Sequence, residues 1–166
     1  KLRLPGITYQ TALLTSDKLL MKQQLETKGI PIPWYAPVIT SRELMSLPDF
    51  THFPVVVKPV DSRGARGVTL LGANADPARA FNYAQKTSPT GRGMVEQFLA
   101  GPQYSSESIF MDGEAITPSL CNRNYEYLHR YAPYIIENGG DWPVQCTPAQ
   151  RVALCRVAED AGKAVG

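Results

Sequence analysis

A lysine and a glycine-containing basic loop follow a strongly apolar stretch, and together they could bind a polyanion. The sequence VVVKPVDSRGARGVTLL, residues 55–71, runs three valines into Lys58 and then into a polar loop from Asp61 to Gly67. Glycines let backbone N–H groups turn toward an anion, and Arg63 and Arg66 add positive charge. Because neighbouring cations repel one another unless an anion lies between them, this combination suits a chain of phosphates.

Each of these features also has an ordinary structural interpretation. The loop lacks the G-x-x-x-x-G-K-[ST] pattern of a Walker A motif, and taken alone it fits a hairpin turn with solvated arginines better. A lone lysine at a strand end usually extends its ammonium into water. A second lysine, Lys18, stands in the first turn of a predicted helix, where a cation opposes the helix dipole. A phosphate docked there would explain Lys18, and a solvated helix lysine is the alternative.

Four helices are predicted from their N-terminal caps and their apolar periodicity. Each begins at a Ser, Thr or Asp whose side chain can accept a hydrogen bond from the first turn, and two carry Glu or Gln three residues later as a capping box. Their caps are Ser16 or Asp17, Thr40, Asp76 and Thr147.

Strands are predicted where β-branched and aromatic residues stand between turn signals. Asp112-Gly113 is the strongest hairpin signal in the chain. The segments expected to be extended are PWYAPVIT, FPVVVKP, GVTLLG, GMVEQFL, the two arms around Asp112-Gly113, and APYIIEN. The order of helices and strands indicates an α+β arrangement in two lobes, with a boundary near residues 95–99.

The composition indicates a folded globular protein and gives little support to several other classes. The chain has 166 residues, 43% hydrophobic and 19% charged, which is enough to build a packed core. A net charge of +2 argues against nucleic-acid or membrane-surface binding. Cys121, Cys146 and Cys155 show neither paired nor metal-ligand spacing, so we expect a reduced, cytoplasmic setting. The first residue is Lys1 and not Met, which suggests a piece of a longer polypeptide, with a trimmed or processed terminus as the alternative.

Three segments in this order resemble the ATP-grasp family, most closely its carboxylate–amine ligases. They are TSDKLLMKQQLETKGIPIP, FPVVVKPVDSRGARGV and VEQFLAGPQYSSES, and the stretch from IIENGGDWP to the last residue is similar to the part that precedes the family's metal-binding segment. The resemblance implies an ATP-grasp fold of two α+β lobes with ATP bound between them, the second lobe being incomplete. It also implies a linker at 1–14, a small lobe at 15–95, and a hinge with the first part of the large lobe at 96–166.

The same resemblance assigns nucleotide contacts. It implies that two lysines bind phosphates, that the glycine-rich loop folds over the triphosphate, and that the hinge backbone reads the adenine edge while the side chain of Glu96 faces the exocyclic amine. The expected nucleotide-binding residues are Lys18, Lys58, Ser62, Arg63, Gly64, Ala65, Arg66, Gly67, Glu96, Gln97, Phe98, Leu99, Gln103 and Glu107. None of them is expected to be a catalytic acid or base, since they position and stabilise charge.

Some positions depart from the family pattern or remain open. Gln103 stands where many members carry an acidic residue that binds the ribose hydroxyls, and the change to neutral hydrogen bonds would cost about 1 kcal/mol. Glu107 fits a cleft-facing residue and a half-exposed strand residue equally well. Arg123, His129 and Arg130 lie in a segment that in such ligases approaches the acceptor substrate, although ordinary surface residues are favoured there.

The resemblance implies the ATP-binding portion of a ligase that activates a carboxylate as an acyl phosphate and joins it to an amine or similar nucleophile. Its partners would be ATP and small carboxylate and amine substrates, with no nucleic acid or membrane. Magnesium ligands are expected beyond residue 166, so these residues alone should be nearly inactive. The alternative is a non-catalytic nucleotide-binding or interaction module, which Gln103 and the abrupt end motivate. A weaker third possibility is a structural α+β domain whose loop binds nothing.

Overall fold

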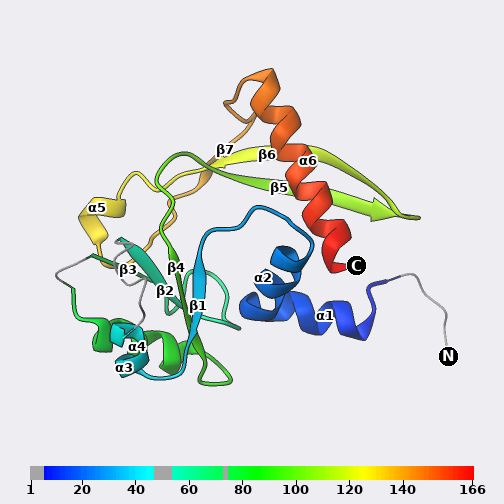
Figure 1. Cartoon of the computed structure of the whole chain (residues 1–166). Helices are drawn as coiled ribbons and strands as arrows, with labels where there is room; N and C mark the ends of the chain where they lie inside the picture. The colour runs from blue at the N-terminus through cyan, green and yellow to red at the C-terminus, as the bar shows by residue number, and fades with distance from the viewer. Residues whose placement is uncertain (1–5, 47–53, 73–74) are drawn as a thin grey trace. The chain divides into compact units, whose positions relative to one another are not determined.

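The computed structural model describes residues 6–46, 54–72 and 75–166 (Figure 1). They form two compact units, each made of segments that lie far apart in the sequence. Unit 1 contains the described part of Lys1–Ile32 together with Tyr104–Cys121 and Trp142–Gly166, and unit 2 contains Pro33–Gln103 and Asn122–Asp141. This division follows spatial contacts, so it differs from the lobes expected at 15–95 and 96–166, which stay a prediction.

Unit 2 is built on a four-stranded antiparallel sheet in the order β1-β4-β2-β3. The strands are β1 (Tyr35–Val38), β2 (Val55–Pro59), β3 (Thr69–Leu71) and β4 (Gly93–Gln97). Branched side chains dominate β2, where they pack well on a pleated surface. The predictions of these four strands are confirmed.

One face of this sheet carries the core of unit 2. The helices α3 (Ser41–Ser46) and α4 (Pro77–Thr87) pack against each other, and α4 packs on the sheet. Val55, Val57 and Val95 meet the buried side chains Ala80 and Phe81 of α4. Because side chains alternate along a strand, residues 56 and 58 of β2 point to the opposite face.

The predicted helix caps form as expected. Asp76 Oδ1 accepts hydrogen bonds from the N–H groups of Ala78 and Arg79, at 2.9 and 3.2 Å. Thr40 and Glu43 form a reciprocal capping box at the start of α3. These local bonds satisfy N–H groups that have no partner inside the helix.

Residues 124–139, here named the strap, return along the open edge of β3. They include the short helix α5 (Leu128–Tyr131) and lead to β7 (Gly140–Asp141), which pairs with Asn122 and Arg123. The prediction of a strand at APYIIEN is wrong, because this stretch makes only an isolated bridge between Thr69 and Tyr134. The carbonyl of Pro133 accepts a hydrogen bond from Leu70 N at 2.7 Å. Because proline lacks an N–H, Pro133 cannot donate a bond that would extend the ladder.

Unit 1 combines helices with a β-hairpin. Its elements are α1 (Tyr9–Ser16), α2 (Lys18–Thr27), α6 (Pro148–Val165), and most of β5 (Gln103–Met111) and β6 (Glu114–Arg123). The predicted hairpin at Asp112-Gly113 and the capping box of Thr147 with Gln150 are confirmed. The order of the second sheet is β5-β6-β7.

The second half of the expected linker at 1–14 contains the start of α1, and residues 1–5 lie outside the described part. The role of this segment as a linker stays a prediction. Thr8 caps this helix by accepting a hydrogen bond from Thr11 N at 3.0 Å. Gly6 stands before the helix begins and does not interrupt it.

Helix α6 packs on the hairpin and on α2. The ring of Phe110 from β5 lies directly over Gly162, Thr117 of β6 donates to Glu159 at 3.1 Å, and Gln24 of α2 donates to the carbonyl of Ala164 at 2.9 Å. Unit 1 is therefore held by contacts between its N-terminal, central and C-terminal segments.

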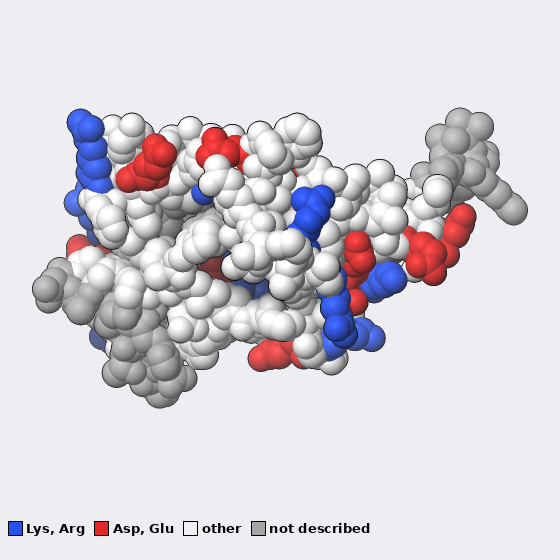
Figure 2. Space-filling model, turned by 90° about the horizontal axis from the view of Figure 1, so that it is seen from above, with Lys and Arg blue, Asp and Glu red and all other residues white. Residues whose placement is uncertain are grey.

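The surface carries charges of both signs. On the face drawn in Figure 2, basic and acidic side chains are interspersed. Among the described residues, no helix has both the length and the apolar character that a membrane span requires.

Candidate functional site

Lys58 and Glu96 form an ion pair on the face of the unit 2 sheet opposite α4. The strand register places Val56 opposite Glu96 and Lys58 opposite Met94, so the two charged side chains are diagonal neighbours. Their side chains are only 16% and 14% exposed. At this burial an unpaired charge is costly, and in the pair each charge compensates the other. The structure thus brings together two residues that the sequence assigned separately to phosphate and to adenine.

The loop from Asp61 to Gly67 is tied down at its first residue. The Asp61 carboxylate accepts hydrogen bonds from the hydroxyls of Ser88 and Thr90, both at 2.5 Å, and from Thr90 N at 3.2 Å. Burial acts to raise the pKa of Asp61, but these hydrogen bonds outweigh it and hold the pKa below its usual value. Asp61 therefore anchors the loop to the turn after α4.

The loop is also tied down at its last residue. Gly67 is buried and has a φ of +76°, and a side chain on it would meet Thr87 of α4 at 2.8 Å. Gly64 and Ala65 share the left-handed conformation with φ of +63° and +55°, but they lie at an exposed tip. The loop thus has a fixed base and an exposed, tightly turned tip.

The two arginines of the loop lie on its exposed side. Arg66 Nε donates to the carbonyl of Arg63 at 3.0 Å. Within the described part of the chain, neither arginine forms an ion pair. Their charges are therefore available to an anion. Ser62 lies beside them in the same loop and is half-buried.

The predicted hinge leaves one backbone donor for a ligand. The N–H groups of Gln97 and Phe98 donate to the carbonyls of Trp34 and Pro54, at 2.9 and 3.2 Å. The N–H of Leu99 lies beyond the end of β4 and donates to no described residue, and the Leu99 side chain is 57% exposed. A nucleobase edge could therefore bind at Leu99, while Gln97 and Phe98 hold the hinge in the sheet.

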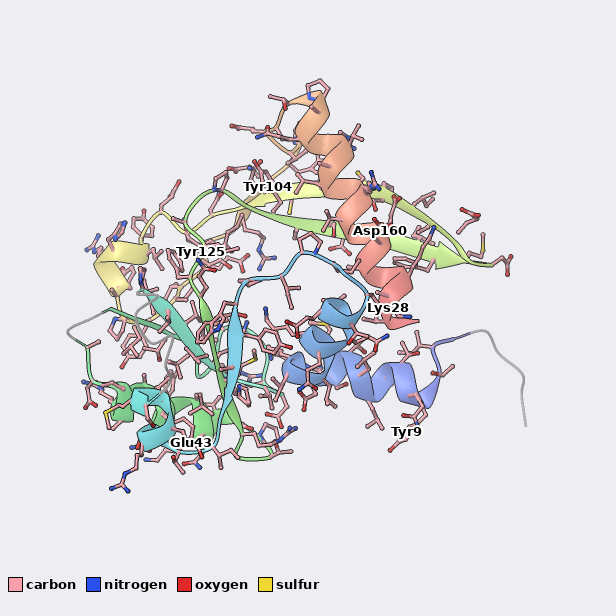
Figure 3. All side chains as sticks on the ribbon, viewed as in Figure 1. Tyr9, Lys28, Glu43, Tyr104, Tyr125 and Asp160 are labelled. Carbon is pink, nitrogen blue, oxygen red and sulfur yellow. The ribbon has the colours of Figure 1, made fainter. Side chains whose placement is uncertain are left out.

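Two clefts lie in unit 2 near these residues. The hinge cleft, of about 350 Å³, is lined by Phe98 and Gln103 of the hinge and by strap residues that include His129. The loop cleft, of about 670 Å³, is lined by the loop tip Gly64–Arg66, by Tyr83 of α4 and by strap residues from Tyr125 to Glu137. Figure 3 labels Tyr125 in the segment that leads to α5.

Arg123 and Tyr125 line both clefts. Arg123 forms an ion pair with Glu137 across the strap. Burial acts to lower the pKa of Arg123, but the charge of Glu137 and the hydrogen bonds outweigh it and raise the pKa above its ordinary value, so the guanidinium stays charged. The sequence favoured ordinary surface positions for Arg123 and His129, and nothing singled out Tyr125. The signal in the sequence that could have pointed to Tyr125 was the concentration of Tyr, Arg and Asn in this irregular segment.

Lys18 and Glu107 belong to unit 1, whereas the other expected nucleotide contacts belong to unit 2. Lys18 opens α2, and the preceding Asp17 caps that helix by accepting bonds from Leu19 N and Leu20 N at 2.9 and 3.1 Å. The cap carboxylate offsets the unfavourable dipole at Lys18. Glu107 is an exposed residue of β5. The nucleotide-binding roles of both residues stay predictions.

Clusters of acidic, histidine and cysteine side chains are possible sites for a metal ion. Residues 6–46, 54–72 and 75–166 contain no group of three or more His, Cys, Asp or Glu side chains that could hold a metal ion. Three carboxylates of unit 2, Asp61, Glu96 and Glu137, are engaged by hydroxyls, a lysine and an arginine.

Comparison with known proteins connects this geometry to a family. The family model described as an ATP-grasp domain matches residues 15–164. The chain is 30% identical over 110 residues to the uncharacterized protein y4rH of Sinorhizobium fredii, covering 63% of this chain and 23% of that protein. It is 24% identical over 146 residues to D-alanine–D-alanine ligase B of Pseudomonas putida, covering 85% of this chain and 44% of that ligase.

Solved structures agree with the fold. The L-amino acid ligase of Bacillus licheniformis superposes with a TM-score of 0.78 at 23% identity, over 98% of this chain and 36% of that one. The VanG D-Ala:D-Ser ligase of Enterococcus faecalis gives a TM-score of 0.80 at 17% identity, over 95% and 47%. The chain spans less than half the length of each of these proteins, and the predicted ATP-grasp fold is confirmed. Since the family model covers most of the sequence, this chain belongs to the ATP-grasp family.

Proposed function

We propose that this chain is the ATP-binding portion of a ligase that activates a carboxylate as an acyl phosphate and joins it to an amine or similar nucleophile. The family relationship and the ligase relatives support an ATP-dependent reaction of this class. Family likeness alone does not assign chemistry to a site, so the proposal rests on the residues of unit 2.

The observation that carries the proposal is the pairing of Lys58 with Glu96 on one sheet face. Glu96 neutralises a lysine that is largely withdrawn from water. A phosphate oxygen can replace Glu96 as the counter-ion, because it offers the same negative charge to the ammonium. Glu96 is then released to accept a hydrogen bond from an exocyclic amine. The two residues of this ion pair would thus bind two different parts of the nucleotide, Lys58 the phosphates and Glu96 the base.

The remaining residues position the nucleotide. The loop, with its fixed base and basic tip, would cover the phosphates, and the N–H of Leu99 would bind the base edge. Fixed donors and cations aimed at developing negative charge supply most of the stabilisation in phosphoryl transfer. Mg²⁺, when bound, neutralises charge on the phosphates, and its ligands would come from outside the described residues.

The test is a calorimetric titration of the chain with Mg·ATP. Because Lys58→Met leaves Glu96 half-buried without its lysine, we pair it with Glu96→Gln in a double variant that restores neutrality. The double variant should bind Mg·ATP at least tenfold more weakly while its thermal unfolding stays close to that of the parent. Lys28→Met, at an exposed lysine of unit 1, is the matched control and should bind as the parent does. Equal affinity in all three proteins would refute the proposal.

A non-catalytic nucleotide-binding module is the second candidate. It is favoured by Gln103, which replaces an acidic ribose contact with an amide, and by the lack of a metal-binding cluster in the described residues. Carboxylate-dependent release of phosphate, measured with the chain in its full genetic context, separates the two. A ligase releases phosphate only when carboxylate and amine are both present, whereas a module binds nucleotide without turnover.

A further inference from the structure

The loop cleft has the size of a small-molecule site and belongs entirely to unit 2. Its volume of about 670 Å³ lies within the ~300–1,000 Å³ typical of ligand pockets. One wall is the loop tip Gly64–Arg66, the second is Tyr83 of α4, and the third is the strap. Lys58 and Glu96 do not line it. The cleft is therefore a separate feature that shares the loop tip with the proposed nucleotide site.

Its walls combine aromatic and aliphatic side chains with charged ones. Tyr83, Tyr134 and Ile136 line the cleft and are 40%, 43% and 44% exposed. Large apolar groups that gather at a concave surface usually mark a binding site. The rings of Tyr83 and Tyr134 meet edge to face, with centroids 5.9 Å apart and planes at 87°, so the faces of these rings are pre-arranged. Such a wall suits a flat or bulky apolar group.

The charges at the cleft leave a net positive end. Arg123 and Glu137 neutralise each other across the strap. Arg66, at the loop tip, is the remaining charged residue of the lining, and within the described part of the chain it has no ion pair. A guanidinium binds a carboxylate through two parallel hydrogen bonds. The cleft thus offers a carboxylate contact at one end and an aromatic wall elsewhere.

We propose that the loop cleft binds the carboxylate substrate and that this substrate carries an aromatic or bulky apolar group. This inference rests on the proposed ligase function, since it names the substrate class of that reaction. Arg66 would hold the carboxylate at the loop tip, the same segment that covers the phosphates, while Tyr83 and Tyr134 hold the apolar body. A side chain as small as a methyl group would leave most of this cleft filled with water, so the cleft discriminates by size.

The probe is 3-phenylpropanoate, titrated into the full chain and followed by calorimetry and by NMR. Acetate supplies the carboxylate without the body, and 3-phenylpropan-1-ol supplies the body without the charge. We expect 3-phenylpropanoate to bind at least tenfold more tightly than either. Tyr83→Ala should weaken its binding about tenfold, because the aromatic wall loses one ring. Tyr9→Ala, at a 73% exposed tyrosine of α1 in unit 1 that Figure 3 labels, is the control and should change nothing.

Arg66→Gln tests the charged end separately. It should abolish the preference for 3-phenylpropanoate over 3-phenylpropan-1-ol while the alcohol binds unchanged. Absence of binding by 3-phenylpropanoate, or equal loss in Tyr83→Ala and Tyr9→Ala, would overturn the inference even if Mg·ATP binds. Conversely, if 3-phenylpropanoate binds as expected and Mg·ATP binding ignores the Lys58→Met/Glu96→Gln change, the proposed function fails while the cleft is retained as a carboxylate site without the ligase role.

Discussion

Asp61 shows how a charged residue beside a basic loop can serve the fold and not the ligand. Its carboxylate is held by the hydroxyls of Ser88 and Thr90 at the turn after α4. Among the described residues it forms no ion pair with Arg63 or Arg66, so the loop's own acid is used for anchoring. The arrangement separates the anchoring of the loop from its electrostatics.

Asp61→Asn should lower the free energy of unfolding by about 1–2 kcal/mol at pH 7, since the charge-assisted hydrogen bonds become neutral. The folded chain lowers the pKa of Asp61 below its ordinary value of 3.8, so folding favours the ionised form. This contribution is complete above the unfolded pKa and is lost as the pH falls through the folded pKa. The unfolding free energies of the two proteins should therefore begin to converge near pH 3.8 and continue to converge as the pH falls through the lower folded pKa. A difference that persists unchanged at pH 2.5 would contradict the assignment.

Gly67 and Gly64 test whether the base of the loop is crowded. Both have positive φ, so alanine at either site carries backbone strain of about 1 kcal/mol. Only at Gly67 would the new methyl group meet Thr87, at 2.8 Å, whereas nothing lies within 4 Å at Gly64. Gly67→Ala should cost about 1–3 kcal/mol more than Gly64→Ala in chemical denaturation. Equal losses would show that Thr87 yields without cost.

Helix α6 and the β5–β6 hairpin illustrate how one small residue allows two elements to pack. Phe110 of β5 lies where a side chain of residue 162 would point, and Ser108 and Thr117 bond across the hairpin at 2.9 Å on the side that meets Glu159. Glycine inside a helix is otherwise unfavourable by roughly 1 kcal/mol. Its presence in α6 is explained by the close approach of the ring.

Gly162→Ala should therefore destabilise the chain, against the usual effect of alanine in a helix. We expect a loss of about 1–3 kcal/mol in unfolding free energy, because the methyl group would overlap the ring of Phe110. Phe110→Ala alone should also destabilise, but adding Gly162→Ala to it should recover up to about 1 kcal/mol. The measurement is a double-mutant cycle, in which the effect of Gly162→Ala on the unfolding free energy should change sign when Phe110 is replaced by alanine. Additive losses would show that the ring does not restrict position 162.

The chain as a whole is organised by contacts between distant segments. Unit 1 joins the N-terminal helices to α6 across more than a hundred residues, as the bond from Gln24 to Ala164 shows. Unit 2 inserts Asn122–Asp141 beside a sheet made earlier in the chain. Neither unit corresponds to a continuous stretch of sequence, so neither can be complete before the last segment is made.

Gln24→Met should loosen unit 1 while unit 2 keeps its stability. The change removes the bond to a carbonyl in the last turn of α6 and retains much of the side-chain volume, so we expect a loss of about 1 kcal/mol. Hydrogen exchange should accelerate about fivefold in α2 and in the last turn of α6. Protection in β2 and β4 should stay constant, because the lost contact lies wholly within unit 1. Uniform acceleration throughout the chain would contradict two separately stable units.

Local patterns predicted most elements, and distant contacts explain the failures. Local residue patterns revealed the caps at Asp76 and Thr147 and the turn at Asp112-Gly113, because each of them depends on neighbours within three residues. The strand expected around Tyr134 fails because Pro133 cannot continue a ladder and the strap meets only the edge of β3. Helix α1 was missed because its apolar periodicity is weak and its packing partners include α6, far along the chain.

In the candidate site, too, local features were predictable and contacts between distant residues were not. Lys58 and the basic loop were candidates from residue types, because a lysine at a strand end and a glycine-rich turn are local features, whereas the hinge was assigned only by the resemblance to the ATP-grasp family. The sequence could not show that Glu96 pairs with Lys58, that Asp61 binds Ser88 and Thr90, or that Tyr125 of the strap enters the same clefts.

The sequence by itself determined the class of this protein: an α+β chain of ATP-grasp type with its strands, caps, basic loop and hinge in a recognisable order. Only the tertiary structure decided which charges neutralise one another, which arginines have no ion pair among the described residues, and that the strap forms one wall of the loop cleft. The physical reason is the separation along the chain between the residues that interact. Turns and caps are set by bonds between near neighbours, whereas ion pairs and clefts depend on where the sheet register and the packing of remote segments place each side chain.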